Sequence, residues 1–459
     1  MKRTLTQFGI AVAFVLIGTT AKAQSDIMYF MYNTPQSSFL NPAFGVKTGT
    51  YLSIPVISGM DLNFNASGFS YSDLVVPQEN SDAVKVSPLN LFNKLGTQND
   101  LSLSGSVNIF GMGFQFGEGH LSVDLTLDGS ARAGLNQSLI GFMFFGSKAN
   151  LNAEDFVYDD KILDMSLYLS PSVSFARELG EKLTVGARLG LLLGLMDITT
   201  ERSDIEIKNT GAGKTIQSNI EILSSSFIGK VESNQFSVED PAWVTDNFGT
   251  ILANAVKNPG VVLDLGASYK LNDKMEISAS VNDLGYIYWS ANPTKISSYT
   301  DNYTYVYEGI GNSFDSLSND FDNYFDALKD TLKHIFDLKA ESTDSYGSMI
   351  PVKFNVGYSW NFAGPHSLFA HYKGIKGNGY YDSYFSLYYN LAWKFLSFTI
   401  GNTFSRHNYL HPALALNING GGFNVYLGGS FCPREFSLAM SDLSSSSVFL
   451  GINFLLGKK

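Results

Sequence analysis

Apolar and polar residues alternate along most of this chain with a period of two. Between residues 261 and 271 every odd position is apolar, and the even positions include Asp264, Ser268 and Lys270. Between residues 352 and 362 the apolar positions are the even ones. Because successive side chains of a β-strand point to opposite sides, this alternation indicates strands with one apolar and one polar face.

The length of these alternating segments favours a membrane barrel over a soluble sandwich. They run for about 10 to 14 residues, whereas strands of soluble proteins average about five or six. A strand needs about 9–11 residues to cross a bilayer at a tilt. Aromatic residues gather at segment ends, as at 286–289 and 388–393, where girdle residues meet lipid headgroups. We therefore expect an all-β fold, a transmembrane antiparallel β-barrel.

Connection lengths set the expected number of strands. The short turns lie at 178–182, 272–274, 363–366, 393–394 and 420–422. Barrels of this kind have short periplasmic turns and long outer loops, which makes external excursions of 203–259, 291–347, 373–379, 405–411 and 433–446. Eleven segments after residue 164 and three before it give about fourteen strands, an even number as in other single-chain outer-membrane barrels.

The alternation changes phase or period at two places in this barrel region. The apolar positions shift from odd to even at Asn282-Asp283, and one extra residue in a strand, a β-bulge, explains such a slip. Residues 313–340 instead repeat apolar groups at helical spacing, beginning with Phe314, Leu317 and Phe321. We expect an amphipathic helix in an external loop, where it covers the barrel mouth or docks a partner.

The segment 24–48 precedes the first complete strand and is rich in apolar side chains. It carries Met28, Tyr29, Phe30, Tyr32, Phe39 and Leu40, followed by Asn41 and Pro42. These groups are too many to stand in water, since each contributes about 1.5–3 kcal/mol when buried. We expect the segment to lie in the barrel lumen as a plug. An alternative is that it only seals the periplasmic mouth for stability.

The first 23 residues have the features of a secretory signal peptide. Lys2 and Arg3 form a basic start, an apolar stretch covers 10–17, and Ala21-Lys22-Ala23 is a small-x-small cleavage site. We expect a mature chain from Gln24, with the barrel over 49–459. The predicted location is the outer membrane, reached with the help of the barrel assembly machinery.

Composition agrees with a barrel and excludes some partners. Charged residues are 16% of the chain and aromatic residues 14%, against about 25% charged in soluble proteins. The net charge of −11 argues against nucleic acid, which needs clustered basic groups. By strand parity the main inward-facing charges are Arg188, Asp264, Lys270, Glu276 and Lys353. Both signs are present, which suits ion pairs that brace the barrel.

Candidate chemistry is sparse, and we expect neither an enzyme nor a metal or cofactor site. Residues 211–215 read Gly-Ala-Gly-Lys-Thr, but a phosphate-binding loop also needs an earlier glycine and a strand-to-helix context. Ser405, Arg406, His407 and His411 lack an orienting carboxylate. His366 and His371 lack a third zinc ligand.

Two stretches resemble known membrane proteins. The run from Met28 to Phe44 and the run from Val262 to Gly285, with Leu-Asn-Asp-Lys at 271–274, resemble an uncharacterised outer-membrane barrel family of the Bacteroidota, a domain of unknown function. The element Leu40-Asn41-Pro42-Ala43 is also similar to one in the long-chain fatty-acid transporter class and in PorP/SprF-type membrane proteins. The transporter class implies fourteen strands and an N-terminal plug.

Two functions follow as hypotheses. The first is a channel or transporter for small or hydrophobic solutes. The second is a non-conducting platform or a secretion-associated partner protein in the outer membrane. The sequence names no solute, no protein partner and no oligomeric state.

Overall fold

The structure is a computed structural model. It describes residues 25–55, 57–77, 84–145, 156–159, 161–210, 213–227, 229–232, 235–238, 247–305, 336–406, 409–433 and 443–456. The predicted signal peptide at 1–23, residue Gln24, and residues 313–335 of the predicted loop helix lie outside these ranges. No helix within the described ranges is long and apolar enough to cross a membrane.

Fourteen antiparallel strands form a closed barrel, as predicted. β1 (Thr50–Ser53) and β2 (Met60–Ala66) share one position, because both pair with β24 (Leu443–Leu456) on one side and with β5 (Gln98–Phe116) on the other. The remaining strands follow in chain order: β6 (Gly119–Asn136), β8 (Leu163–Leu179), β9 (Leu183–Thr210), β13 (Pro259–Asn272), β14 (Met275–Trp289), β18 (Val352–Ala363), β19 (His366–Lys376), β20 (Tyr381–Ala392), β21 (Leu396–Ser405), β22 (His411–Gly420) and β23 (Phe423–Pro433). Closure leaves no unpaired edge, which a membrane requires.

The two faces of the strands divide as the alternation predicts. On β13 and β18, Leu265 and Val356 point outward and are 46% and 54% exposed, whereas Ser268 and Asn355 point inward and are 3% and 2% exposed. An apolar outer band around a polar interior is the arrangement of a transmembrane barrel. Five of the short turns that the sequence predicts join these strands at one end, which we call the turn end. The opposite end is the loop end.

The predicted bulge on β14 is confirmed. Leu263 pairs with Leu284 and Leu265 with Val281, so two residues of β14 face Asp264 alone. Asp283 has φ of 61°, and its backbone N–H donates to Asp264 Oδ1 at 2.7 Å. Because of the bulge, the Asp283 N–H has no backbone partner on the neighbouring strand, and the side chain of Asp264 accepts its hydrogen bond instead.

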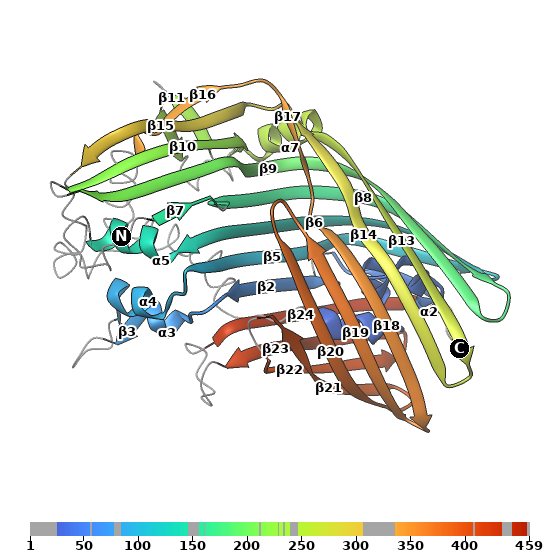
Figure 1. Ribbon diagram of the computed structural model, residues 1–459. Helices are drawn as coiled ribbons and strands as arrows, with labels where there is room; N and C mark the ends of the chain where they lie inside the picture. Colours follow the sequence, from blue (N-terminus) through green and yellow to red (C-terminus); the bar gives the residue numbers. More distant parts are fainter. Residues whose placement is uncertain are drawn as a thin grey trace.

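The longest strand, β9, joins the barrel to a smaller sheet at the loop end. Its first half pairs with β13, and its second half pairs with β10 (Gly213–Ser225), which continues to β15 (Pro293–Tyr305) and β16 (Lys339–Ser342). These strands leave the barrel together in Figure 1. Ile205, Ile207 and Ile216 bury one face of this sheet against α5 (Gln137–Phe145). The external excursions predicted over 203–259 and 291–347 therefore contain strands that the alternation did not predict, because an apolar face there supports them.

Shorter elements surround this loop end. They are α3 (Tyr71–Leu74), β3 (Val75–Pro77), β4 (Val84–Val86), α4 (Pro88–Lys94), β7 (Phe156–Tyr158), β11 (Gly229–Glu232), β12 (Gln235–Val238), α7 (Phe248–Lys257) and β17 (Tyr346–Met349). The end of the predicted 313–340 helix is wrong, since Lys339 already begins β16.

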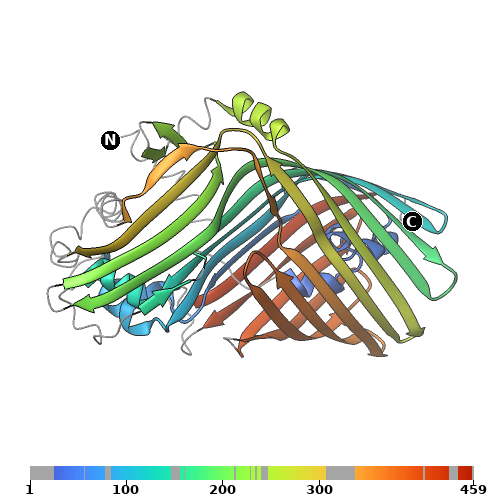
Figure 2. The same cartoon turned by 45° about the horizontal axis from the view of Figure 1, so that its top comes forward.

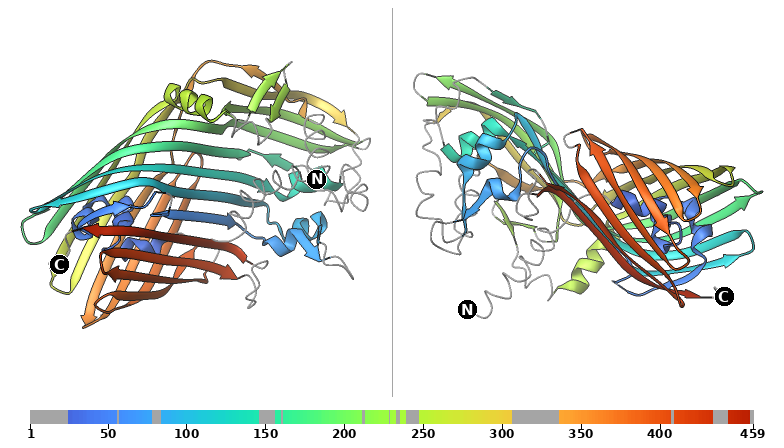
Figure 3. Two further views of the ribbon diagram at one scale, coloured as in Figure 1. Left: turned by 180° about the vertical axis from the view of Figure 1, so that it is seen from behind. Right: turned by 90° about the horizontal axis from the view of Figure 1, so that it is seen from below.

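The chain before β1 forms four short helices inside the ring of strands. They are the 3₁₀ helices η1 (Ser25–Phe30), η2 (Pro35–Phe39) and η3 (Pro42–Phe44), and α2 (Gly45–Thr48). Both views of Figure 3 show these blue helices enclosed by strands. We refer to residues 25–48 as the N-terminal segment.

A charge on the lipid face is predicted to destabilise the barrel more than the same charge in the lumen. Leu265→Arg places a guanidinium in the apolar band and is expected to cost about 2–4 kcal/mol. Ser104→Arg, on the inner face at a half-buried position, is the matched control and should cost less. Unfolding in lipid vesicles, followed by gel mobility with and without heating, measures both. Equal costs would contradict the facing assigned here.

Candidate functional site

The N-terminal segment contacts the barrel wall at two glycines. Gly186 of β9 and Gly266 of β13 pair with each other and face the lumen. A Cβ on Gly186 would lie 2.4 Å from the carbonyl carbon of Pro42, and one on Gly266 would lie 2.0 Å from Asn41 Oδ1. Neither glycine has a positive φ, so backbone conformation does not require glycine at these positions. Glycine is needed here because the backbone of the segment approaches the wall so closely.

Asn41 is the polar anchor of this contact. It is fully buried, and its Oδ1 accepts from the N–H of Ala43 at 3.0 Å, which caps η3. Its Nδ2 donates to the Tyr29 hydroxyl at 3.1 Å and faces the carbonyls of Ala267 and Ala279 at 3.3 Å. Pro42 begins η3, where a missing N–H is tolerated. The Leu-Asn-Pro-Ala element is thus the part of the segment that rests on the wall.

Aromatic contacts hold the start of the segment. The ring of Tyr29 stacks on His371 and that of Phe30 on Phe369, each with centroids 4.4 Å apart. The Tyr29 hydroxyl donates to Ser278 Oγ at 3.0 Å. Burial raises the pKa of Tyr29 to about 12, so the hydroxyl keeps its proton at neutral pH and remains a donor.

A reciprocal amide pair joins η2 to the last strand. Gln36 Nε2 donates to Asn453 Oδ1 at 3.0 Å, and Asn453 Nδ2 donates back to Gln36 Oε1 at 2.9 Å. Both side chains are buried. The segment is therefore bound on opposite sides of the lumen, at β24 and at β9–β13.

Arg188 links the wall, the bulge and the segment. Its Nη1 donates to Asp264 Oδ2 at 2.9 Å and its Nη2 to the carbonyl of Ser38 at 2.6 Å. The guanidinium also lies 4.6 Å above the ring of Phe39. Both charged side chains are nearly buried, and removing one partner of such a pair costs about 3–5 kcal/mol.

Two more ion pairs connect segment and wall. Asp26 pairs with Lys373 of β19 at 3.1 Å, and Lys47 pairs with Glu276 of β14 at 2.5 Å. Burial lowers the pKa of Lys47, and the adjacent Glu276 carboxylate acts in the opposite direction. Four of the five predicted inward charges thus meet partners in the lumen: Arg188 with Asp264, Glu276 with Lys47, and Lys353 with Asp283 at 2.6 Å. Lys270 is exposed and lies across from Glu276 near the turn end.

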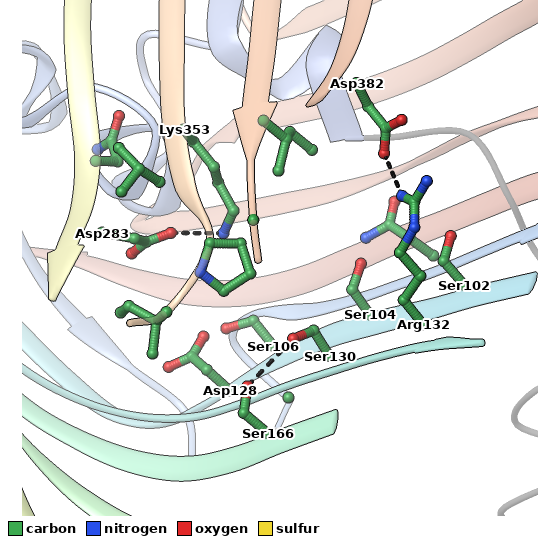
Figure 4. Close-up of a pocket in the computed structure, with 18 of the residues that line it drawn as sticks. Ser102, Ser104, Ser106, Asp128, Ser130, Arg132, Ser166, Asp283, Lys353 and Asp382 are labelled. Atoms are coloured by element: carbon green, nitrogen blue, oxygen red, sulfur yellow. Dashed lines mark hydrogen bonds and ion pairs between the residues drawn. The ribbon is translucent and has the colours of Figure 1, made fainter. Parts of the chain in front are cut away.

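A cavity of about 1220 Å³ lies in the lumen beside the N-terminal segment. Met28, Gln36, Phe39 and Leu40 of the segment line part of it. One wall is mainly hydroxylic and amide-bearing, with Asn63, Asn65, Ser102, Ser104, Ser106, Ser130, Ser166, Ser170 and Ser172. The facing wall carries Lys353, Lys373 and Tyr384. Figure 4 shows the serines opposite the Lys353–Asp283 pair.

Arg132 spans this cavity toward the loop end. From β6 it donates to Asp100 Oδ2 at 2.8 Å and to Asp382 Oδ2 of β20 at 2.7 Å, although β6 and β20 are not neighbours in the barrel. Its guanidinium also stacks 4.0 Å over the ring of Tyr380. Next to it, Asn378 Nδ2 donates to Thr199 Oγ1 at 3.1 Å. The tip of the β19–β20 hairpin therefore reaches across the lumen, as Figure 2 shows.

Of the candidate chemical groups of the sequence, Ser405, Arg406 and His411 line the lumen cavity, whereas His366 and His371 do not. His371 lies in the lumen against Asn355 at 3.2 Å, whereas His366 contacts the Tyr389 hydroxyl. Lys214 and Thr215 lie on β10, a strand rather than a helix start. His407 lies outside the described residues, and within those residues no group of three metal-ligating side chains occurs.

The contacts that the sequence did not predict are those of Gly186, Gly266 and Arg132. An inward glycine within an alternating strand is a recognisable signal, because it leaves room for another backbone. The pairing of Arg132 with Asp382 joins residues 250 positions apart, and no local pattern indicates it.

We predict that Gly186→Ala releases the N-terminal segment while the barrel stays folded. The new methyl group would occupy the place of the Pro42 backbone, which cannot move without losing the contacts of Asn41. Hydrogen–deuterium exchange over residues 25–48 should rise by at least an order of magnitude, since about 1.4 kcal/mol corresponds to tenfold. Ala187→Val, on the outer face of the same strand, is the control and should leave exchange unchanged. Unchanged exchange in Gly186→Ala would refute the docking role.

A second prediction concerns the hairpin tip. Arg132→Ala removes both ion pairs and the stacking on Tyr380, so amides of residues 377–381 should exchange faster. Those of residues 25–48 should not, because the contacts of Arg132 are with Asp100, Asp382 and Tyr380, which lie outside the segment. Arg177→Ala, an exposed arginine at the turn end, serves as the control. Equal protection of the tip in both variants would show that Arg132 does not hold it.

Solved structures with similar barrels were found. The chain is similar to the Pseudomonas aeruginosa FadL homologue (10% identity, 92% of this chain and 94% of that chain, TM-score 0.44). It is also similar to the toluene transporters TbuX of Ralstonia pickettii (10%, 91% and 92%, 0.41) and TodX of Pseudomonas putida (12%, 95% and 93%, 0.38). With TM-scores below 0.5, none of them carries an argument about function.

No curated protein matches the sequence. The similarity of Leu40–Ala43 to PorP/SprF-type proteins and the assignment to the Bacteroidota stay predictions. A model of the protein family DUF5723 matches residues 42–429, which include both the docking glycines and the charged pairs of the lumen. The chain therefore belongs to DUF5723, a family of unknown function.

Proposed function

We propose that this protein is an outer-membrane passage for small polar solutes, with the N-terminal segment as its plug. The single observation that carries the proposal is the polar cavity of about 1220 Å³ bordered by a separately folded segment. A barrel of fourteen strands encloses more space than its wall side chains fill. The segment occupies part of that space through contacts that do not belong to the wall's own hydrogen-bond ladder.

The hydroxyl, amide and charged groups of the cavity favour polar over hydrophobic solutes, although apolar side chains such as Leu192, Ile350 and Phe449 also line it. Serine hydroxyls and asparagine amides form one wall, and ion pairs such as Lys353–Asp283 form part of the other. An apolar solute would strip water from these groups without replacing their hydrogen bonds, which costs about 1–3 kcal/mol for each group. A small hydroxylic or charged solute replaces those bonds. The sequence alone allowed both solute classes.

The apolar contacts of the segment support its proposed role as a plug. Ile27, Met28, Tyr29, Phe30 and Phe44 are each less than 9% exposed. Each of these side chains contributes about 1.5–3 kcal/mol when buried, so their burial favours the docked position of the segment. Opening therefore requires either a partner that binds the segment or a change in its contacts with the wall.

The proposed location follows from the outer surface. Large apolar side chains such as Leu191, Leu265 and Leu387 are exposed around the barrel, and a lipid bilayer covers such a band. We infer an outer membrane, with the turn end in the periplasm, export by a signal peptide cleaved near Ala23, and insertion by the barrel assembly machinery.

A non-conducting platform remains the other hypothesis of the sequence. No contact among the described residues favours it, whereas a platform has no use for a hydroxyl-lined cavity of this size. Two results together would favour the platform over the passage. One is a stable protein partner in native membranes, and the other is a barrel that does not conduct after release of the segment.

Release of the plug is predicted to open the passage. Gly186→Ala, and separately deletion of residues 26–40, should give folded barrels that conduct ions in planar bilayers, whereas the unchanged protein and Ala187→Val should not. Exchange over residues 25–48 verifies that the segment is displaced in Gly186→Ala. A folded variant with a displaced segment that remains as tight as the unchanged protein would overturn the proposed function.

A further inference from the structure

We propose that the passage selects cationic solutes, because several carboxylates of its cavity form no ion pair among the described residues while its buried cations do. This inference rests on the proposed function and names the solute class of the same lumen. Nine acidic and seven basic side chains line the cavity. Since these numbers of acidic and basic side chains are nearly equal, the field in the cavity depends on which of them form ion pairs.

The buried lumen cations are neutralised by carboxylates. Arg188 pairs with Asp264 at 2.9 Å, Lys353 with Asp283 at 2.6 Å, and Lys373 with Asp26 at 3.1 Å. Arg132 contacts two carboxylates, those of Asp100 and Asp382. Such a cation presents little free charge to a passing solute, because its donors are already directed at a carboxylate.

Among the described residues, three cavity carboxylates accept hydrogen bonds from neutral donors and form no ion pair. Asp128 accepts from the Thr126 hydroxyl, and Asp197 accepts from the Tyr346 and Ser348 hydroxyls, each at 3.0 Å. Asp164 accepts from Thr199 Oγ1 at 2.9 Å and from the Thr200 N–H at 3.3 Å through Oδ1 alone. Its second oxygen, Oδ2, is buried and has no partner. Hydroxyl donors stabilise the charged form of a carboxylate but supply no positive charge to balance it.

These carboxylates lie along one wall of the cavity. Asp128, Asp164 and Asp197 stand on the consecutive strands β6, β8 and β9. In the strand register Asp164 lies opposite Thr199, and Asp197 lies opposite Ser166. Figure 4 shows Asp128 pointing into the cavity between Ser106 and Ser166. A solute that moves through the lumen thus passes along a negatively charged wall.

The other cations that line the cavity do not reverse this field. Lys376 and Arg406 are exposed, so water and salt screen them. Lys161 donates to the Thr200 carbonyl, beside the carboxylate of Asp164. Charges of one sign in a narrow space with low-dielectric walls raise the local concentration of counter-ions. The wall that carries Asp128, Asp164 and Asp197 therefore attracts cations.

Ion selectivity of the opened barrel tests this inference. In Gly186→Ala, the zero-current potential across a bilayer with a potassium chloride gradient gives the permeability ratio of potassium to chloride. We expect potassium to be several-fold more permeant. Adding Asp128→Asn and Asp164→Asn, which keep size and acceptor oxygens, should bring the ratio close to one. Asp273→Asn, an exposed acid in a turn between β13 and β14, is the matched control and should leave it unchanged.

The outcomes separate the two proposals. Equal permeability or a preference for chloride in the conducting Gly186→Ala barrel overturns cation selectivity but leaves the passage intact. The same conclusion follows if the two asparagine variants keep the full preference. Asp128→Glu retains the charge and should retain the preference, which guards against a misfolded asparagine variant. A barrel with a displaced segment that does not conduct overturns the passage and the selectivity together.

Discussion

The contact of Asn41 and Pro42 with two glycines of the wall is the interaction on which the interior of this protein depends. A side chain on Gly186 or Gly266 would occupy the same space as the segment. Because the wall has no side chain there, the buried amide of Asn41 can satisfy its hydrogen bonds within the segment and against the strand carbonyls. The other contacts of the segment follow from this position.

Charge pairing then makes wall and segment complementary. Arg188 is held by Asp264 of the wall and donates to a carbonyl of the segment, while Asp26 and Lys47 of the segment meet Lys373 and Glu276 of the wall. A buried charge without its partner is costly in a dry interior. In a hydrated lumen the cost is smaller, since water replaces the partner. The polar wall therefore permits both a plugged and a water-filled form.

Asp264 connects this interior to the geometry of the strands. One of its oxygens binds Arg188 and the other accepts the N–H of the bulged Asp283, whose side chain pairs with Lys353. The same bulge that shifts the outward apolar positions on β14 thus places a carboxylate against the cavity. The bulge on β14 is therefore the common cause of the phase shift in the strand and of the position of the Asp283 carboxylate in the lumen.

The alternation of apolar and polar residues was enough to predict the barrel fold. It indicates which side chains face lipid, and the number of alternating segments gives the number of strands. It also indicated the bulge at Asn282-Asp283, because a phase slip is a local property. The pairing of charges could not be predicted in this way, because it depends on closure of the barrel. Arg132 and Asp382, for example, lie 250 residues apart and meet across the lumen. The strands over 203–225 and 293–305 were missed for a similar reason: the apolar face that they cover, on α5, comes from another part of the chain. The sequence indicated which charged residues face the lumen, because their positions alternate with the apolar ones. It did not indicate which of them form ion pairs, because closure of the barrel brings the partners together.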